Sequence, residues 1–197
     1  LFFFKQMTAY ESMPSLVGSE MCIRDSNSLS ASVQLMLVPN GSPLAHAEGS
    51  QNVVVVDGVR SGETAFSGFG AGGAPTAVAV ISDVTAISRN GSHMSNWPRQ
   101  SSNVPAQTEF ESAHYIRFVV IDRPGIISEL ARIFATHDIN IDSLLQEPGC
   151  SKTELPFVIT LERCNTRAVR DALSEIQRFD FHARDPFWMP ILARGEK

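Results

Sequence analysis

The spacing of hydrophobic and polar residues changes along the chain and divides it into two blocks. In the first block, 31–90, short apolar runs each end at a turn signal, which predicts strands at 33–39, 52–58 and 62–68. The second of these runs is nearly continuous valine, and a run of that kind indicates a strand buried on both faces. We therefore expect these runs to form part of a β-sheet.

The apolar spacing then becomes that of a helix. Pro75 suits the first turn of a helix, and a wide apolar stripe follows it. The stripe consists of Val78, Val80, Ile81, Val84 and Ile87. Residues 91–112 are polar, contain Pro98 and Pro105 and show no periodicity, so we predict a linker there.

The second block has the order strand, helix, strand, strand, helix, strand. The predicted elements are strands at 114–122, 139–147, 155–163 and 180–192, and helices at 123–138 and 165–179. This order is the ferredoxin-like split motif, β-α-β-β-α-β. The last strand contains Pro186 and Pro190, which cannot donate to a ladder, so we place it at a sheet edge.

The two predicted helices of the second block each carry an apolar face. Asn165 or Thr166 is expected to cap the second helix. The expected buried residues are Ile127, Leu130, Ile133 and Phe134 in the first helix and Val169, Leu173 and Ile176 in the second. The chain as a whole is therefore predicted to be α+β.

Residues 1–26 differ in style from the rest of the chain. The stretch 16–26, LVGSEMCIRDS, reads like a translated sequencing adaptor, so we expect 1–26 to be non-native and disordered. A signal peptide is the rival interpretation. Its apolar run would be only four residues long, and Lys5 follows that run instead of preceding it.

Composition and charge narrow the function classes. The net charge is −5 and there is no basic cluster, so we expect no nucleic-acid partner. No apolar stretch is long enough to span a bilayer, so we expect no membrane partner. Cys150 and Cys164 lack the spacing of a zinc site or a disulfide scaffold, which fits a cytoplasmic protein without a metal.

The turn that opens the first helix of the second block has candidate chemistry. Pro124 fixes the turn, and Gly125 allows a small ligand or another backbone to approach closely. The exposed amides at the helix start can meet a carboxylate, and Asp122 can pair with an α-ammonium group. The bland interpretation is an ordinary strand-to-helix turn with a capping aspartate.

Residues 122–146, with their D-R-P-G turn and N-I-x-S strand start, resemble an ACT domain, the small ligand-sensing module of amino-acid metabolism. We assign this domain to 113–197. The resemblance implies an amino-acid effector and a homodimer, with polar groups near Asn140 closing the site from a neighbouring subunit. The candidate effector-binding residues are Asp122, Pro124, Gly125, Ile126, Asn140 and Ile141.

The first block carries a second resemblance. Its segments LVPNGSPLA, NVVVV and GFGAGGAPTA, followed by a helix with Ser-Asp, resemble the last part of the catalytic region of homoserine dehydrogenases. We assign this part to 27–90. Ser42 stands where that family often has His, and Val53 where it usually has Ala; neither position is catalytic in the family pattern.

The glycines after the third predicted strand match G-x-G-x-x-G at Gly68, Gly70 and Gly73. A Rossmann fingerprint would follow a buried strand directly and have an acidic residue about 20 positions beyond it, at the end of the next strand. Here the valine run ends well upstream, at Val56, and Asp83 falls inside the predicted helix. A self-contained Rossmann site is therefore not expected.

The resemblance to homoserine dehydrogenases implies a different role for this loop. Gly70, Ala71 and Gly72 would contact the nicotinamide side of NAD(P) in the full-length enzyme, and no tight cofactor binding is expected for this chain. The family's catalytic lysine and its acidic partners lie upstream of residue 31 in that pattern. We therefore predict no catalytic residue here and no turnover by this chain alone.

The two resemblances together imply the C-terminal part of a homoserine dehydrogenase. That enzyme interconverts aspartate 4-semialdehyde and homoserine in threonine, methionine and isoleucine biosynthesis, and threonine is the expected effector. The alternative is a stand-alone ACT protein that regulates another enzyme or serves only to oligomerise. Residues 33–90 argue against a free-standing sensor, which would have no use for the valine strand or the glycine loop.

Overall fold

The computed structural model describes residues 2–5, 18–24, 29–58, 60–90 and 105–192. The chain forms two compact units. Unit 1 comprises 1–34 and 42–107, and unit 2 comprises 35–41 and 108–197. Within the described ranges, no helix combines the length and the apolar character needed to cross a membrane.

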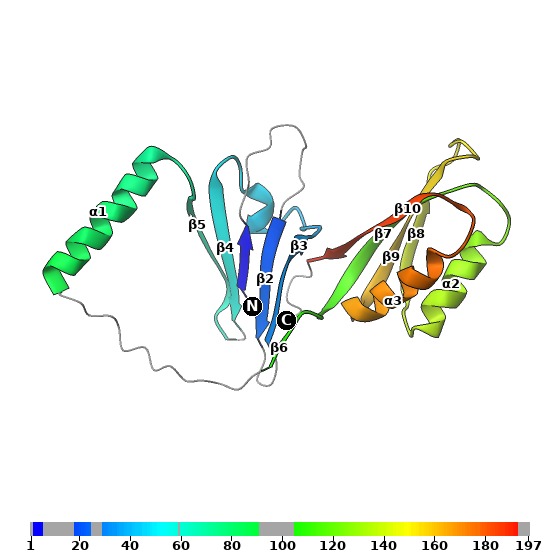
Figure 1. Ribbon diagram of the computed structural model, residues 1–197, viewed down its shortest axis with the longest axis horizontal. Helices are drawn as coiled ribbons and strands as arrows, with labels where there is room; N and C mark the ends of the chain where they lie inside the picture. The colour runs from blue at the N-terminus through cyan, green and yellow to red at the C-terminus, as the bar shows by residue number, and fades with distance from the viewer. Residues whose placement is uncertain (1, 6–17, 25–28, 59, 91–104, 193–197) are drawn as a thin grey trace. The chain divides into compact units, whose positions relative to one another are not determined.

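Unit 1 contains a six-stranded sheet with the order β5-β4-β1-β2-β3-β6 (Figure 1). Its strands are β1 (Phe2–Lys5), β2 (Gly18–Arg24), β3 (Leu29–Leu35), β4 (Gln51–Gly58), β5 (Gly62–Phe69) and β6 (Ala106–Gln107). β4 pairs antiparallel with both β1 and β5, whereas β3 and β6 are parallel. The short helix η1 (Pro43–His46) lies between β3 and β4 in sequence, and α1 (Gly73–Asn90) follows β5.

The valine strand β4 is buried on one face only. Val53 and Val55 are 4% and 2% exposed, while Val54 and Val56 are half-buried. The prediction of burial on both faces is therefore wrong for the chain as described. The physical reason is that the later elements of unit 1 do not cover the second face: all of β5 is exposed, and so is every apolar residue of the α1 stripe.

Two strands of unit 1 fall where we expected no regular structure. β1 and β2 lie within 1–26, and β1 pairs with both β2 and β4. The structure thus differs from the expected disorder at these two strands, because β4 offers Val53–Val56 as a ladder that a short apolar strand can join. The non-native origin of 1–26 stays a prediction.

The segment expected to form a strand at 33–39 divides between the two units. β3 ends at Leu35, and Leu37 forms an isolated parallel bridge with Ile191 of unit 2. The amide of Leu37 donates to the carbonyl of Pro190 at 2.9 Å, and the amide of Leu192 donates to the carbonyl of Leu37 at 2.8 Å. We call Leu35–Gly41 the strap.

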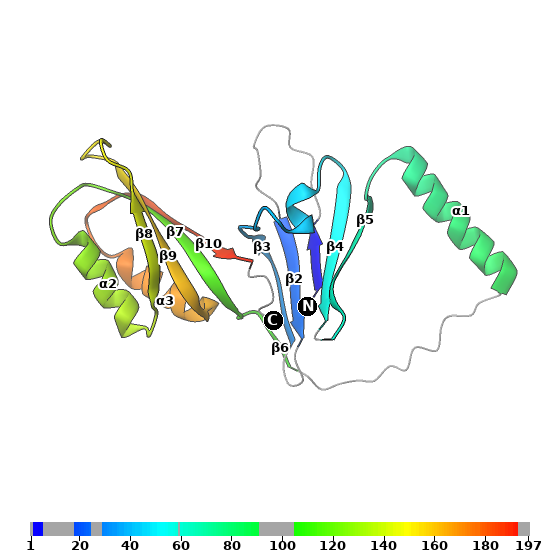
Figure 2. The same ribbon diagram turned by 180° about the vertical axis from the view of Figure 1, so that it is seen from behind.

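Unit 2 has the predicted β-α-β-β-α-β order. Its elements are β7 (Glu111–Val120), α2 (Ile126–Thr136), β8 (Ile141–Gln146), β9 (Leu155–Asn165), α3 (Thr166–Ile176) and β10 (His182–Ile191). The sheet order is β10-β7-β9-β8 with antiparallel neighbours, and both helices cover the same face (Figure 2). The predicted ferredoxin-like fold and the α+β class are confirmed, and β10 is an edge strand of this sheet.

The boundaries of unit 2 differ from the expected domain 113–197. The unit begins at Thr108 and also includes the strap, which comes from the expected catalytic segment. The expected linker 91–112 contains the short strand β6, and its first part, 91–104, lies outside the described residues. Backbone pairing explains both differences, because β6 joins β3 and the strap joins the end of β10.

The core of unit 2 lies between the sheet and the two helices. Buried residues of β7, β9 and both helices form it, among them Ile116, Phe118, Ile159, Phe134 and Ile176. Ile141 of β8 and Trp188 of β10 are half-buried and pack against it. The α3 prediction is confirmed: Val169, Leu173 and Ile176 are buried, and the Asn165 side chain accepts from the Arg167 amide at 2.9 Å. These contacts fix α3 on the sheet.

The buried face of α2 is shifted by one residue from the prediction. Leu130, Ile133 and Phe134 are buried as expected, but Ile127 is 39% exposed and Ile126 takes its place at 6%. The helix begins at Ile126, directly after Gly125 in the left-handed conformation. The buried positions therefore follow the spacing i, i+4, i+7, i+8 from Ile126.

A buried histidine connects three strands of unit 2. His114 on β7 is 0% exposed, and its Nδ1 accepts from Trp188 Nε1 on β10 at 3.1 Å. Its Nε2 lies 3.2 Å from the carbonyl of Cys164 on β9. Since Nδ1 accepts, Nε2 carries the proton and donates to that carbonyl. Desolvation by burial lowers the pKa of His114, so the ring is neutral.

Candidate functional site

A cavity of about 340 Å³ opens where β7 gives way to α2. Its apolar wall consists of Val120, Ile126, Ile127, Leu155 and Phe157. Asp122, Arg123, Ser128 and Gln146 contribute polar groups to the lining, and Pro124 and Gly125 complete the turn. A mainly apolar hollow with a few convergent polar groups is the usual form of a small-molecule site.

Backbone hydrogen bonds hold the turn at the cavity from both flanks. The Ile121 amide donates to the carbonyl of Phe181 at 2.8 Å, and the Asp122 amide donates to the carbonyl of Lys152 at 2.7 Å. Gly125 adopts φ +97°, a conformation that a residue with a side chain rarely takes. The turn is thus fixed in a shape that glycine makes possible.

The start of α2 presents backbone amides at the cavity. Gly125 is the N-cap residue and has no side chain, so no side-chain oxygen accepts from these amides at that position. Ile126, Ile127 and Ser128 occupy the first turn and line the cavity. The first amides of a helix lack intrahelical partners and carry a partial positive charge, which favours a carboxylate.

Arg123 at the cavity rim is engaged by the segment before β10. Its guanidinium forms an ion pair with Asp180 and lies over the Phe181 ring, 5.5 Å from the centroid. The hydrogen bond from Arg123 lowers the pKa of the Asp180 carboxyl and raises the pKa of the guanidinium. Both groups are largely exposed, so this pair orients the rim more than it stabilises the fold.

The structure brings together four of the six candidate effector residues. Asp122, Pro124, Gly125 and Ile126 all line the cavity. Asn140 and Ile141 do not line it: the Asn140 amide donates to the Glu162 carboxylate at 3.2 Å, and Ile141 packs against the core. Within one chain these two residues do not contribute to the hollow, and their role in a neighbouring subunit stays a prediction.

Sequence reasoning missed several lining residues on neighbouring strands. Gln146 is the last residue of β8 and pairs with Phe157, while Leu155 pairs with Val120. The pattern of alternating residues in each strand was available, but it does not give the register between strands. The register is what places Gln146 beside the turn.

The glycine loop of unit 1 joins β5 directly to α1. The Gly70 amide donates to the carbonyl of Ser50 at 2.8 Å, and a Cβ added at Gly70 would collide with the Asn52 side chain. Gly72 has φ +125°, and its carbonyl accepts from both the amide and the hydroxyl of Thr76, at 3.1 and 2.8 Å. The loop is therefore a fixed, exposed backbone surface at the start of a helix.

This loop is not part of a self-contained dinucleotide-binding unit among the described residues. The missing Cβ of Gly70 makes room for the Asn52 side chain, that of Gly72 faces Pro75, and Ala71 adds only a methyl group to the loop. β5 is exposed and antiparallel to β4, whereas a dinucleotide fold needs a parallel βαβ unit. Ser42 and Val53, the two residues that depart from the pattern of homoserine dehydrogenases, have structural roles here. Ser42 Oγ accepts from the Leu44 amide at 3.3 Å, and the Val53 side chain is buried.

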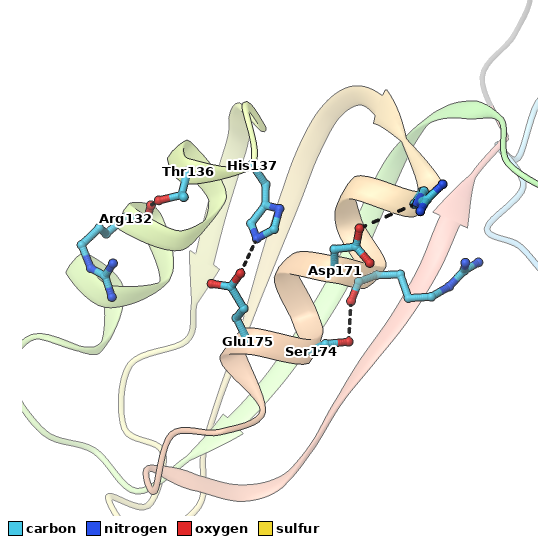
Figure 3. A network of polar contacts seen from close by, with 8 residues as sticks. Arg132, Thr136, His137, Asp171, Ser174 and Glu175 are labelled. Carbon is cyan, nitrogen blue, oxygen red and sulfur yellow. Dashed lines mark hydrogen bonds and ion pairs between the residues drawn. The ribbon is translucent and has the colours of Figure 1, made fainter.

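Other titratable groups form structural contacts. His137, at the end of α2, lies 3.0 Å from Glu175 of α3, as Figure 3 shows. Burial raises the pKa of the Cys164 thiol to about 11, so it is protonated at neutral pH. Among the described residues, no group of three or more His, Cys, Asp or Glu side chains is placed to hold a metal ion.

Two protein-family models match the chain. Residues 5–85 match the model described as homoserine dehydrogenase, and 114–181 match the ACT domain. Homoserine dehydrogenase of Helicobacter pylori is 31% identical over 143 residues, which are 72% of this chain and 34% of the relative. That of Mycobacterium bovis is 39% identical over 126 residues, which are 62% of this chain and 29% of the relative.

Solved structures give the same relationship. A homoserine dehydrogenase from Thiobacillus denitrificans aligns with a TM-score of 0.76 at 25% identity, over 91% of this chain and 42% of that one. The Staphylococcus aureus homoserine dehydrogenase at pH 6.5 shares the fold, with a TM-score of 0.56. The chain spans about a third of the length of the curated relatives it matches.

Proposed function

We propose that this chain, which joins a segment similar to homoserine dehydrogenases to a segment similar to ACT domains, is the amino-acid-sensing C-terminal part of an NAD(P)-dependent homoserine dehydrogenase. The full enzyme would interconvert aspartate 4-semialdehyde and homoserine. The cavity at the D-R-P-G turn, inside the ACT match, is the observation that carries the sensing role.

The cavity suits a small amino acid with an uncharged side chain. The first amides of α2 can receive the carboxylate, and Asp122 can receive the α-ammonium group. Val120, Leu155 and Phe157 form an apolar wall that disfavours a charged side chain. Threonine fits these requirements and is the effector we propose.

The glycine loop supports a cofactor contact in the full enzyme. Gly70, Ala71 and Gly72 would lie against NAD(P) through their backbone, at the positive end of α1. When bound, the cofactor supplies hydride transfer. The loop's part is to orient it, and we propose no tight cofactor binding to this chain alone.

We also propose that these 197 residues do not turn over substrate by themselves. Lys152 is exposed, and its carbonyl accepts a hydrogen bond from the Asp122 amide. Lys152 therefore lies near the cavity of unit 2, and in the sequence it is far from the glycine loop. The free thiols of Cys150 and Cys164 fit the cytoplasm, where amino-acid biosynthesis takes place.

A second function is that unit 2 only assembles subunits. The exposed edge strand β8 supports it, because Leu144 and Leu145 are 41% and 63% exposed and an open edge can pair with another chain. A homodimer through the ACT domain is compatible with both functions. A stand-alone ACT regulator is disfavoured, because 5–85 match the catalytic family.

The test is calorimetric titration of the whole chain with threonine. We expect saturable binding that Asp122→Ala weakens at least about ten-fold, since the α-ammonium group would lose its charged partner. Asp171→Ala is the matched control, because Asp171 is an exposed carboxylate on α3 that pairs with Arg167. Methionine, isoleucine and lysine serve as comparison ligands. A folded dimer that binds none of the four amino acids would leave only the assembly function.

A further inference from the structure

The strap is a short segment of unit 2 that lies between two parts of unit 1 in the sequence. It follows β3 of unit 1 in sequence, yet Leu35–Gly41 belongs to unit 2. Leu37 exchanges two backbone hydrogen bonds with the end of β10, through the Pro190 carbonyl and the Leu192 amide. The chain therefore passes between the units at three points, and the strap lies between the first two.

The strap is packed as well as hydrogen-bonded. Met36 is 5% exposed, and Leu192, beside the bridge, is 7% exposed. The Ser112 hydroxyl donates to the Ile191 carbonyl at 2.6 Å, which ties the bridged end of β10 to β7. Opening the bridge would expose these apolar side chains and break the ladder, so the strap is a structural part of unit 2.

The connection is short on the side of β3. That strand ends at Leu35, and Met36 alone separates it from Leu37. One strand residue spans only about 3.3 Å, so a shift of Leu37 must be taken up by β3. On the other side Asn40 and Gly41 form a turn before η1, and this turn can change its conformation when Leu37 shifts.

The sheet of unit 2 extends from the cavity to the strap. At one end of β7, Val120 lines the cavity and pairs with His182 at the start of β10. At the other end of β7, Ala113 pairs with Ile191, the residue bridged to Leu37. A change in the stability of this ladder therefore acts on both places.

We propose that the strap couples unit 2 to β3, so that occupancy of the cavity changes the opening of β3 in the sheet of unit 1. The coupling rests on the proposed function only for the identity of the ligand. In physical terms, β10, Leu37 and β3 open together. A change in stability at the cavity or at β3 therefore shifts this common opening equilibrium.

Hydrogen exchange of the β3 amides in the whole chain tests this coupling. We compare the unaltered chain with two variants that carry a Gly-Ser-Gly insertion. One insertion follows Leu35, on the short side of the strap, and the matched control insertion follows Asn40, inside the turn. With saturating threonine, β3 exchange is expected to slow several-fold in the unaltered chain and in the control. It stays unchanged when the insertion follows Leu35, although the binding heat is the same in all three proteins.

A ligand-free arm makes the result independent of threonine. Ile176→Ala empties a fully buried position of α3 and should speed exchange throughout unit 2. In the unaltered chain and the control, β3 exchange is expected to rise with it by at least about ten-fold. The insertion after Leu35 should abolish that rise.

The outcomes separate the two proposals. Absence of threonine binding would contradict the proposed effector, while the Ile176→Ala arm would still decide the coupling. The coupling is wrong if Ile176→Ala leaves β3 exchange unchanged in the chain without an insertion. It is also wrong if Ile176→Ala raises β3 exchange equally when the insertion follows Leu35.

Discussion

At the scale of single residues, His114 shows how burial decides the state of a side chain. Both ring nitrogens are engaged, one as acceptor from Trp188 and one as donor to the Cys164 carbonyl. A second proton on Nδ1 would face the Trp188 N–H, so protonation would break that hydrogen bond. The fold of unit 2 is therefore built around a neutral imidazole.

The lowered pKa of His114 predicts a pH-dependent stability. In the unfolded chain the ring takes up a proton below about pH 6.5, whereas in the folded chain it resists protonation to lower pH. Its contribution is thus fully present above about pH 6.5 and is lost as the pH falls below that value. Urea unfolding at pH 7.5 and 5.5 measures this loss, which one group limits to about 1.4 kcal/mol per pH unit.

His114→Gln is the control for this effect. Glutamine keeps a donor and an acceptor but does not titrate. The variant should be less stable at pH 7.5 and should show a weaker fall in stability between pH 7.5 and 5.5. An identical fall in both proteins would mean that another group is responsible.

Gly70 gives a second prediction at this scale. A methyl group there would collide with the Asn52 side chain, whose amide end can shift, so Gly70→Ala should lower the stability of unit 1 by only about 1 kcal/mol. Asn52→Ala removes the colliding atoms and should restore most of the loss in the double variant. Gly73→Ala is the control, because a Cβ at Gly73 meets nothing within 4 Å. Thermal unfolding of the four proteins measures the coupling, and additive losses in the double variant would contradict it.

At the scale of elements, α2 shows what the sequence could not predict. The apolar residues of α2 are adjacent at Ile126 and Ile127, so periodicity alone fits either as the first buried position. The left-handed Gly125 decides between them, because it sets the residue at which the helix begins. By contrast, α3 has a single apolar face and a polar cap at Asn165, and its prediction was confirmed.

A matched pair of substitutions tests the assignment for α2. Leu130→Ala removes a fully buried side chain and should lower the free energy of unfolding by about 2–5 kcal/mol. Ile127→Ala removes a side chain that is 39% exposed and should cost clearly less. Chemical unfolding of unit 2 in the whole chain measures both values. Equal losses would return Ile127 to the core.

The candidate sites, too, could be predicted where local sequence fixes the geometry, and not where strand register does. Local geometry predicted the turn from Asp122 to Ile126, because proline and glycine fix it within a few residues. The cavity's far wall depends on strand register, which places Gln146 and Leu155 at the same end of the sheet. Periodicity shows which face a strand buries but not how neighbouring strands align.

At the scale of the whole molecule, the two units differ in how completely they cover their apolar surface. Unit 2 buries residues of β7, β9 and both helices in one core. Unit 1 leaves the α1 stripe open, with Val80 and Val84 57% and 62% exposed. An amphipathic helix of this kind is stabilised chiefly by packing its apolar face against another surface.

The open stripe predicts self-association of the chain through α1. Val80→Lys with Val84→Lys should reduce association at micromolar concentration, because two charges would have to be buried in the contact. Ala79→Lys with Ala86→Lys places the same charges on the opposite side of the helix and serves as the control. Sedimentation velocity measures the association. Equal behaviour of the two variants would show that α1 is not the contact.

The bridge between Leu37 and Ile191 also bears on how the protein is made. Its two partners come from opposite ends of the described chain, so the loop that it closes is long. Leu37 leaves the ribosome before β10, which is synthesised last among the described strands. During translation Leu37 therefore lacks its partner Ile191 until β10 has been synthesised. We expect the bridge to close only then, as a late step of folding.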